Sequence, residues 1–552
     1  MKKSIPEEVP VSANADVIKA TLTALPANDD DVTTETPVDV ESPQAIDFTQ
    51  PLSIDALAAL TGKKVWEVEL DHFVQKEFNK DFAVVLNGTK AVVMKTMLDT
   101  LEEDDAPRKL RVYLPTQSFH ALYANTVIQS NEKEVATGVF EAVYATKSNA
   151  WFKHKYRQQY LDGIVFIPYQ YVNGIEKRPQ ISFKKLNLWD GYSVKPIKGM
   201  SCALDRILYH IKHIICRDDE ACYQYILNWI ASCLQYPDKN GQVAVVLKGK
   251  KGCGKSTLGH LLLIIFGQHG LQIANPKYLV GNFNAHLADC AFLFADEAFF
   301  AGDKQHENIQ KALITESKMI VEKKGVDAEV VKNRLKILMA SNAEWVVPTS
   351  EDERRYFVLD VSSEEIGKAE YFKPLRADIA NPAIQSAFLF EMLHRDISNF
   401  IVGKYPDTKA SQHQRAQSLD SFGHYWMDVL QRGFVYQSQH GNESFRDWSC
   451  EVASELIHQG YTQWFNRNKI GQFGIVPREK VGRYLSSWYG DKKRKLNAIG
   501  FLIGETVKGE EDISKKQTIV YVVGTHTEAI ISFCNAEKLD SANLLKSINL
   551  HT

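Results

Sequence analysis

The chemically most informative stretch of the chain is GKKGCGKS, which runs from Gly249 to Ser256. It matches the pattern G-x-x-x-x-G-K-[ST], whose glycines let backbone N–H groups approach the phosphates of a nucleotide. In this pattern the lysine contacts the β- and γ-phosphates and the hydroxyl ligates Mg²⁺, which here assigns those roles to Lys255 and Ser256. The predicted nucleotide-binding residues are Gly249, Lys250, Lys251, Gly252, Cys253, Gly254, Lys255, Ser256 and Thr257.

An acidic pair, Asp296 and Glu297, follows the apolar run AFLFA at 291–295. Ligands of open α/β sheets bind at the carboxyl ends of the strands, where this pair is expected to lie. The spacing from Lys255 is 296 − 255 = 41 residues, and it makes the pair more informative than it is alone. Asp296 is predicted to hold Mg²⁺ through water, and Glu297 to orient or deprotonate the attacking water.

Two further motifs continue the series. The segment RLKILMASN at 334–342 reads as a strand that ends in a polar pair, and the amide of Asn342 could bond both the γ-phosphate and the lytic water. Arg354 and Arg355 follow in SEDERRYFVLDV at 350–361, and guanidinium groups neutralise charge on a transferring phosphoryl group. The sequence does not decide which arginine acts, or whether it acts on a neighbouring subunit. The alternative interpretation of this segment is a solvated charged loop.

The elements that must hold these residues are visible in the apolar pattern. GQVAVVL before the glycine loop predicts a strand, and STLGHLLLIIF after it predicts a helix. Helical spacing runs from 203 to 236 and ends before Pro237. Upstream, 82–86 and the following AVVMK predict a hairpin, and 163–172 predicts another strand. The fold class is therefore α/β with a parallel sheet, preceded by a mixed region.

The four motifs in this order closely resemble helicase superfamily 3, the compact AAA+ helicases of viruses, phages and plasmids, and most of all its primase-helicase type. The stretches FNKDFAVVLNG (78–88), NLWDGYSVKP (187–196) and YILNWIASCLQYP (225–237) resemble the run-in of that type. The specific motifs cover about 250–360 and the looser likeness about 75–400. The resemblance implies an AAA+ P-loop NTPase core at 201–400.

The resemblance also implies a hexameric ring around DNA, ATP between subunits, and movement on single-stranded DNA, typically 3′ to 5′. Such helicases carry basic residues into the pore on a loop between the acidic strand and the S–N strand. In this chain the corresponding candidates for phosphate-backbone contacts are Lys323 and Lys324, with a solvated hairpin tip as the alternative. No region here resembles the primase of many relatives, so a separate primase or polymerase is expected as a partner.

Near the C-terminus, residues 461–500 carry nine Lys or Arg against two acids, a net of 9 − 2 = +7, with aromatics interleaved. A helix-compatible VPREKVGRYLSSWYG, a basic stretch and the strand-like QTIVYVVG resemble a winged helix-turn-helix. A basic surface of this kind supplies salt-dependent DNA affinity. The candidate DNA contacts are Lys492, Lys493, Arg494 and Lys495, with a solvated face beside an ordinary core as the alternative.

The amino-acid composition limits the classes of protein that are possible. The 552 residues are 44% hydrophobic and 24% charged, with a net charge of 65 − 68 = −3, which excludes a wholly disordered or fibrous chain. Residues 1–50 hold three Lys against ten acids, so a disordered acidic tail is expected there. The longest apolar run, LLLIIF at 261–266, is far below the ~20 residues of a membrane span. A soluble, cytoplasmic protein with no membrane partner is expected.

The expected domains are an acidic tail at 1–50, a mixed region at 51–200, the ATPase core at 201–400 and a basic module at 401–552. The predicted function is ATP- and Mg²⁺-dependent unwinding of forked DNA, by a homo-hexamer on single-stranded DNA, in replication of a phage, satellite or other mobile element. Two alternatives stay open: a nucleic-acid-dependent AAA+ switch, and a replication initiator. A metal site on His210, His213 and Cys216 is disfavoured, because the first and last lie about 240° apart on a helix.

Overall fold

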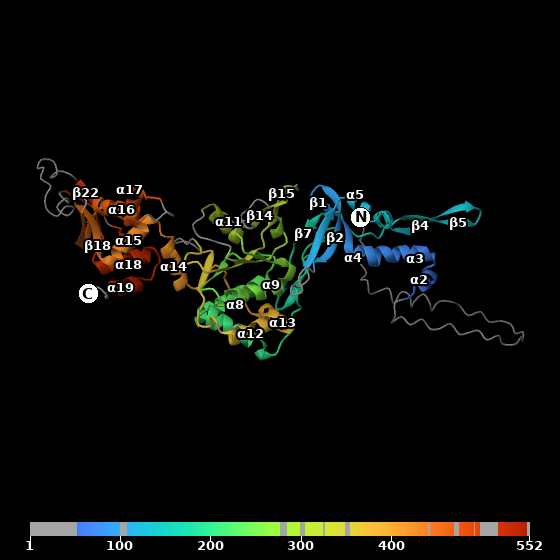
Figure 1. The fold of residues 1–552 in the computed structure, drawn as a ribbon, viewed down its shortest axis with the longest axis horizontal. Helices are drawn as coiled ribbons and strands as arrows, with labels where there is room; N and C mark the ends of the chain where they lie inside the picture. Colours follow the sequence, from blue (N-terminus) through green and yellow to red (C-terminus); the bar gives the residue numbers. More distant parts are fainter. Residues whose placement is uncertain are drawn as a thin grey trace, which may run out of the picture. The chain divides into compact units, whose positions relative to one another are not determined.

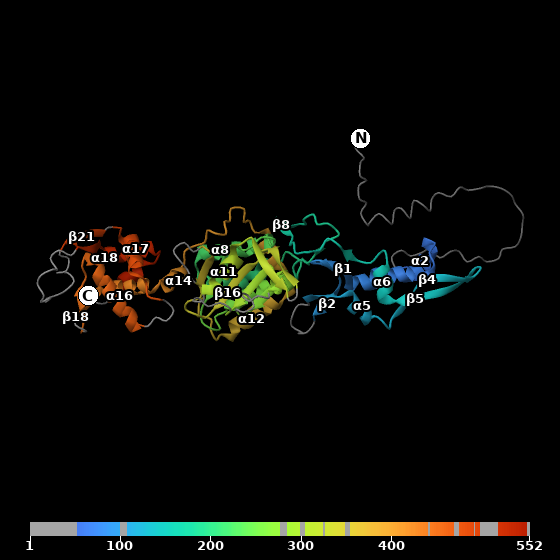
Figure 2. The same cartoon turned by 90° about the horizontal axis from the view of Figure 1, so that it is seen from above.

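The structure is a computed structural model of the chain, drawn in Figures 1 and 2. It describes residues 52–99, 108–275, 284–297, 304–323, 326–347, 354–439, 442–468, 474–490, 492–496 and 517–548, so the predicted tail at 1–50 lies outside it. The described residues up to Val68 and those from Glu69 onward form two compact units, each described by itself. In the first, the Ser53 side chain caps helix α2 (Ile54–Thr61) by accepting a hydrogen bond from the Ala56 N–H at 3.2 Å.

The second unit begins in helix α3 (Val65–His72), which runs into the π-helix η2 (Phe73–Phe78) and the short α4 (Asn79–Asp81). A four-stranded sheet follows, in the order β3-β2-β1-β6. Its strands are β1 (Phe82–Asn87), β2 (Lys90–Asp99), β3 (Arg108–Leu114) and β6 (Gln159–Tyr160). The antiparallel pairing of β1 with β2 confirms the hairpin predicted from 82–86 and its return.

Shorter elements complete this region. Helices α5 (Thr116–Leu122) and α6 (Lys147–Lys153) flank a long two-stranded hairpin, β4 (Val127–Ala136) with β5 (Val139–Thr146). The single strand predicted at 163–172 is wrong in one respect, since it is split into β7 (Ile164–Val165) and β8 (Gln170–Val172). Pro168 lies between the two and has no N–H to donate to a ladder. Strand β8 pairs with β9 (Ile175–Lys177), and β7 pairs with β10 (Leu186–Asn187).

The helical spacing predicted at 203–236 corresponds to several consecutive elements. These are the 3-10 turn η3 (Ser201–Leu204), α7 (Asp205–Tyr209), the π-helix η4 (His210–Ile215) and α8 (Glu220–Gln235). The Asp219 side chain caps α8 by accepting from the Cys222 N–H at 2.9 Å. Helix α8 ends two residues before Pro237, as the sequence predicts.

Residues 244–360 contain a five-stranded parallel sheet, called the central sheet below, in the order β12-β13-β16-β11-β17. Its strands are β11 (Ala244–Lys248), β12 (Gly270–Ile273), β13 (Phe292–Asp296), β16 (Lys336–Ser341) and β17 (Tyr356–Asp360). The fold class is therefore α/β with a parallel sheet. The chain adds a hairpin, β14 (Lys318–Lys323) with β15 (Val326–Lys332), between β13 and β16.

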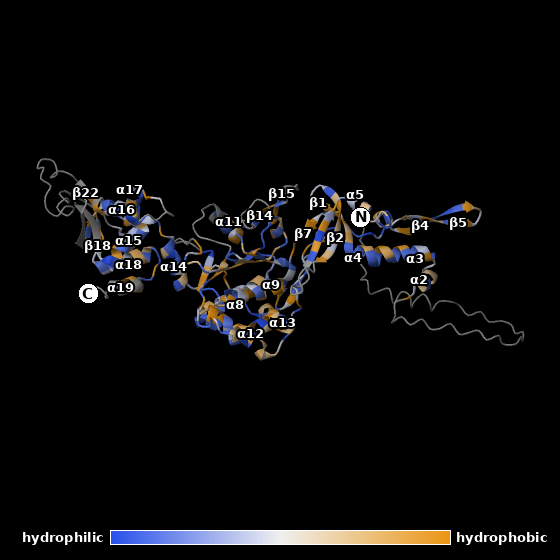
Figure 3. Ribbon diagram, in the orientation of Figure 1, coloured by the Kyte–Doolittle hydropathy of each residue, from blue (hydrophilic) through white to orange (hydrophobic). Residues whose placement is uncertain are grey.

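Both faces of this sheet are covered, which is why its strands read as continuous apolar runs. In β11, Val245 and Leu247 face a core shared with α8, α9 (Lys255–Phe266), α12 (Ala369–Ala380) and α13 (Pro382–His394). Ala244 and Val246 face a second core, shared with α11 (Lys304–Thr315) and α14 (Lys409–Ser418). Figure 1 shows the first group of helices on one side of the sheet and α11 on the other, and Figure 3 shows apolar residues along the strands.

The C-terminal residues build a separate hydrophobic core around Phe422, Trp426 and Trp488. Its elements begin with α15 (Ser421–Arg432), the hairpin β18 (Phe434–Gln439) with β19 (Asn442–Asp447), β20 (Glu451–Ala453) and α16 (Ser454–Asn468). They continue with α17 (Arg478–Tyr489), β21 (Lys492–Leu496), β22 (Gln517–Val522), α18 (His526–Ala536) and α19 (Ser541–Ile548). Strands β20, β22 and β21 form an antiparallel sheet in that order.

Candidate nucleotide site

The glycine-rich loop joins the carboxyl end of β11 to the first turn of α9. Gly252 and Gly254 adopt φ values of +82° and +95°, the left-handed region that glycine enters without strain. The side chain of Cys253 is fully buried, and a Cβ added to Gly249 would lie 3.0 Å from its Sγ. The loop therefore folds around Cys253 and leaves Lys250 and Lys251 exposed.

Lys255 is buried at the start of α9, and its ammonium group is held by oxygens of two loops. Its Nζ donates to the Gly249 carbonyl at 2.8 Å, the Lys250 carbonyl at 2.9 Å and Oδ1 of Asn342 at 2.6 Å. The structure thus brings Lys255 and Asn342 together, although 87 residues separate them in the chain. A cation at a helix N-terminus, among open backbone N–H groups, is suited to a phosphate anion.

The hydroxyl group of Ser256 faces the first acidic residue. Its Oγ donates to Oδ2 of Asp296 at 3.2 Å, and Gln272 of β12 donates to the same oxygen at 3.4 Å. Asp296 is the last residue of β13, so two strands of the sheet and helix α9 meet at this carboxylate. A hydroxyl beside a carboxylate offers the oxygen ligands that Mg²⁺ prefers, with phosphates and waters completing its shell.

Glu297 lies directly beyond β13 in a strained backbone conformation, with φ of +57°. Its N–H donates to the Ala340 carbonyl at 2.9 Å, which anchors it to β16. Its Oε2 accepts from the backbone N–H of Asn342 at 3.2 Å and from the Ser341 hydroxyl at 3.5 Å. Strained residues of this kind persist where the surroundings fix them, often at active sites. Lys255, Ser256, Asp296, Glu297 and Asn342 therefore converge on one edge of the sheet.

An ion-paired group beside this edge was missed by sequence reasoning. Lys248, the last residue of β11, is buried, and its Nζ contacts Oε2 of Glu344 at 2.7 Å and Oδ1 of Asp360 at 3.9 Å. The hydrogen bond and the positive charge of Lys248 lower the pKa of the Glu344 carboxyl. Lys248 and Asp360 end β11 and β17, and Glu344 follows β16. Charged residues at the ends of predicted strands are a signal by which the sequence could have shown this group.

Arg354 and Arg355 are the predicted site residues that the structure does not bring to this edge. They precede β17, whose first residue, Tyr356, pairs with Ala244 at the amino end of β11. About 13 Å of strand separates Tyr356 from Asp360, at ~3.3 Å for each residue. Neither arginine therefore reaches the glycine loop of its own chain. Arg354 is exposed and Arg355 is half-buried.

A groove of about 960 Å³ leads away from the loop. Gly252, Gly254, Lys255, Ser256 and Thr257 line one end of it. The other lining residues were not predicted as site residues: Ser193, Val194, His260, Leu263, Ile264, Gln272, Phe372, Arg376, Ile379, Ala380, Pro382 and Gln385. They come from α9, β12, α12, α13 and the 187–196 stretch, so only the three-dimensional fold assembles this surface.

The predicted DNA contacts are described only in part. Lys323 ends β14 and pairs with Val326, so the expected hairpin exists, but the Lys323 side chain and Lys324 lie outside the described residues. Lys492, Lys493, Arg494 and Lys495 form β21, with side chains outside the described residues. Among the described residues, no three His, Cys, Asp or Glu side chains group as a metal site, and no helix has the length and apolarity to cross a membrane.

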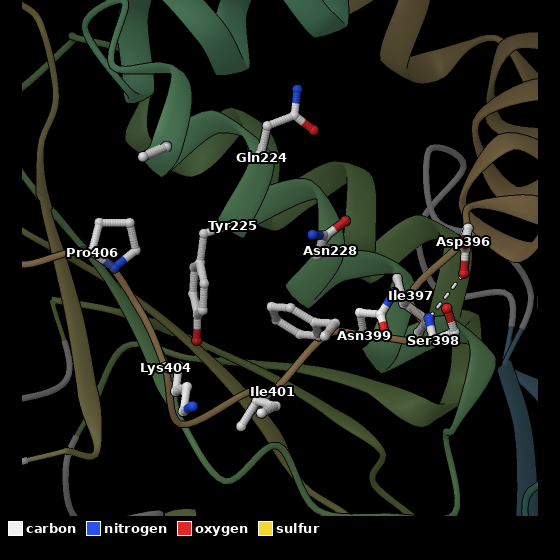
Figure 4. Close-up of a pocket in the computed structure, with 12 residues that line it drawn as sticks. Gln224, Tyr225, Asn228, Asp396, Ile397, Ser398, Asn399, Ile401, Lys404 and Pro406 are labelled. Carbon is white, nitrogen blue, oxygen red and sulfur yellow. Dashed lines mark hydrogen bonds between the residues drawn. The ribbon is translucent and has the colours of Figure 1, made fainter.

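A second hollow, of about 510 Å³, lies between α8 and residues 396–406 (Figure 4). Gln224, Tyr225 and Asn228 line it from α8, and Lys404 lines it from the facing loop. It contains none of the predicted site residues. The candidate site is therefore the carboxyl edge of the central sheet with its adjoining groove.

The chain is similar to known proteins in sequence and in structure. Residues 247–355, which include the glycine loop and the acidic strand, match a family described as a family of unknown function (DUF5906). The chain is also related to the DNA Primase-polymerase of Nitratiruptor phage NrS-1, with 26% identity over 368 residues. That stretch is 64% of this chain and 48% of the phage protein, so the chain spans about half the length of that relative.

Solved structures of the C-terminal region of NrS-1 are also similar to the chain. The apo structure of that region has a TM-score of 0.46 and 16% identity, and covers 80% of this chain and 96% of that chain. Its A form apo structure has a TM-score of 0.44 and 15% identity, with the same coverage.

Proposed function

We propose that the chain is an ATP-dependent DNA helicase of superfamily 3 type that acts in the replication of a phage or related mobile element. The observation that carries the proposal is the convergence of Lys255, Ser256, Asp296, Glu297 and Asn342 at one edge of the parallel sheet. The relationship to a phage primase-polymerase supports a role in replication. This chain then supplies the motor, and a separate primase or polymerase remains the expected partner.

The order of the central strands supports the proposed site. Strand β16, which leads to Asn342, lies between β11, which leads to the glycine loop, and β13, which carries Asp296. Asn342 therefore lies between the phosphate-binding lysine and the acidic pair, where it bonds to both Lys255 and Glu297.

The proposed hydrolysis follows from these contacts. Lys255 and the N–H groups of the loop bind and orient the phosphates, and Ser256 with Asp296 would hold Mg²⁺, which supplies charge neutralisation on the phosphates. Glu297 orients the attacking water and takes up its proton, since its Oε2 is fixed beside Asn342 at 3.2 Å. The Asn342 side chain accepts from Lys255 through its Oδ1, so its Nδ2 group would donate to the γ-phosphate.

The position of the arginine pair supports a ring of subunits with shared sites. Because Arg354 and Arg355 precede β17 at the edge opposite the glycine loop, they can serve only the nucleotide of another chain. Head-to-tail interfaces of this kind generate rings when the rotation closes. We propose a homo-hexamer, with Arg354 as the residue that reaches across, because it is the more exposed of the pair.

The first experiment is strand displacement on a forked DNA with ATP and Mg²⁺, with wild type and Glu297→Gln side by side. Unwinding by wild type, and a loss of at least about 100-fold in the variant, is expected because the amide cannot take up the proton of water. The variant should still bind nucleotide, which a fluorescent ATP analogue would measure. ATP hydrolysis by wild type without displacement would contradict the helicase proposal.

A second candidate function, duplex recognition by an initiator, is favoured by the C-terminal topology. Apart from the hairpin β18–β19, which is inserted between α15 and β20, the order α15-β20-α16-α17-β21-β22, with β22 between the other two strands, resembles a winged helix. Helix α17 buries Val481, Leu485 and Trp488 and exposes Arg483 on its other face. Preference of the chain for one duplex sequence over forks would favour this function, and equal binding to all duplexes would count against it.

A further inference from the structure

A buried histidine outside the predicted site contacts the glycine loop directly. His210 begins the π-helix η4 and is 2% exposed. Its Nε2 lies 3.1 Å from the carbonyl oxygen of Gly254, and its Nδ1 lies 2.9 Å from the hydroxyl of Tyr371 on α12. The histidine therefore joins the residue before Lys255 to a helix 161 residues away from His210 in the chain.

The two partners fix the tautomer of the ring. A backbone carbonyl only accepts, so Nε2 must carry the hydrogen and donate it to Gly254. Nδ1 is then unprotonated and accepts the hydrogen bond from the Tyr371 hydroxyl. Burial lowers the pKa of His210 to about 4, so the ring stays neutral and this pattern persists at neutral pH.

The contact is too close for any other residue at position 254. A Cβ built on Gly254 would lie 2.5 Å from Cε1 of His210 and 3.0 Å from Cε1 of Phe372. The left-handed φ of +95° separately favours glycine there. The loop therefore rests against one side chain from η4 and one from α12.

Helix α12 is tied to the same segment at a second point. The guanidinium of Arg206, one turn before His210 on α7, donates from Nε and Nη2 to the Asp378 carboxylate at 2.5 and 2.8 Å. The same helix α12 lines the groove with Phe372, Arg376 and Ile379. The segment from Arg206 to His210 thus connects the wall of the groove to the phosphate-binding loop.

From these contacts we infer that His210 is a positioning residue, which holds the Gly254 peptide in the orientation that nucleotide binding requires and couples it to α12 through Tyr371. The inference rests on the proposed nucleotide site. Rotation of the Gly254 peptide would turn the first N–H groups of α9 away from the phosphates. The bond from His210 removes that freedom before binding, which is preorganisation of an anion site.

The test compares three variants in the full chain by affinity for a non-hydrolysable ATP analogue with Mg²⁺, and by kcat and KM for ATP. His210→Leu fills the space without a donor, and we expect about tenfold weaker binding with KM raised more than kcat falls. His210→Gln keeps an N–H donor near the position of Nε2, and we expect affinity within about threefold of wild type. Tyr371→Phe loses only the bond that orients the ring, and an intermediate value is expected.

A matched control is available in His269, which is also fully buried and has its pKa lowered to about 4 by burial. Its Nδ1 bonds the Asp289 carbonyl at 2.9 Å, at the opposite edge of the sheet. His269→Gln should lower the melting temperature while the analogue affinity stays at the wild-type value. The control separates the loss of a buried histidine from the loss of the contact to the loop.

Two results would overturn the inference: His210→Leu that binds the analogue as wild type does, or a folded His210→Gln that binds as weakly as His210→Leu. If His210→Leu does not fold, His210→Gln and Tyr371→Phe still decide, since wild-type affinity in Tyr371→Phe contradicts coupling to α12. Failure of the proposed function is seen separately, as wild type that neither binds nor hydrolyses ATP.

Discussion

At the scale of single residues, the site depends on side chains and peptides that fix one another before any ligand binds. Lys255 has three oxygen partners, and Glu297 is held by its own N–H and by that of Asn342. Such preorganisation costs no rearrangement at the moment of reaction. It also makes the folded chain sensitive to acid, because buried neutral histidines such as His210 and His269 must stay uncharged to keep their contacts.

The buried histidines predict a loss of stability in mild acid. Burial holds the pKa of both His210 and His269 at about 4, against 6.5 in the unfolded chain. Between these pH values the unfolded chain binds protons that the folded chain does not, so the free energy of unfolding rises with pH in this window. The stabilisation of the folded chain by its neutral histidines is fully present above pH 6.5. It is lost as the pH falls toward 4, and the free energy of unfolding then drops by up to about 1.4 kcal/mol per pH unit for each ring.

Urea denaturation at pH 7.0, 6.0 and 5.0 would measure this slope. His269→Gln should flatten it, because one buried histidine no longer takes up a proton on unfolding, while His210 and His424, whose pKa burial also lowers, still do. His394→Gln, which replaces an exposed histidine, serves as the control and should leave the slope unchanged. A stability that is constant from pH 7 to 5 in wild type would contradict the prediction.

At the scale of elements, the sequence predicts best where a strand is buried on both faces. The strands at β11, β13 and β16 were predictable because a covered parallel strand is one apolar run ended by a polar residue. The bond between His210 and Tyr371 and the groove wall on α12 could not be predicted. The apolar pattern of a helix does not show which distant segment it meets. The strand predicted at 163–172 failed where Pro168 interrupts the ladder.

The hairpin β14–β15 is the element from which a DNA-dependent effect is expected. Asn333 fixes its base by donating to the carbonyls of Leu313 at 2.8 Å and Glu316 at 2.9 Å. Asn284 holds one edge of β14, where it donates to the Ile320 carbonyl and accepts from the Glu322 N–H, both at 2.8 Å. These bonds fix the described strands of the hairpin relative to the central sheet. Lys323→Ala combined with Lys324→Ala should therefore reduce DNA stimulation of the ATPase, because phosphate contacts supply affinity without sequence preference.

The measurement is ATPase activity with and without single-stranded DNA over a salt series. We expect stimulation to fall at least about tenfold in the double variant, and the dependence of DNA binding on salt to become shallower, since fewer counterions are released. Lys318→Ala with Lys332→Ala, at the opposite end of the same strands, is the matched control. Equal losses in both double variants would assign the effect to the general charge of the hairpin instead of its tip.

At the scale of the whole molecule, a single chain does not bring together all the residues of the proposed site. The glycine loop follows the carboxyl end of β11, and the arginine pair precedes the amino end of the neighbouring β17, so a parallel sheet separates the two. A transition state that needs both must draw them from different chains. The strand direction that groups Lys255, Asp296 and Asn342 at one edge places Arg354 at the other edge. In the proposed mechanism, assembly is therefore a condition of activity.

Subunit mixing tests this consequence directly. Lys255→Ala removes the phosphate contact but keeps Arg354, and Arg354→Ala does the reverse, so each variant alone should hydrolyse little ATP. In a ring built head to tail from equal amounts of both, about one quarter of the interfaces pair an intact loop with an intact arginine. The mixture should therefore recover up to about a quarter of wild-type ATPase, and more than either variant at the same total concentration. A mixture that only averages the two variants would contradict a shared site. An inactive Arg354→Ala would then place Arg354 in its own subunit, whereas an active Arg354→Ala would remove it from catalysis and make Arg355→Ala the next variant to mix.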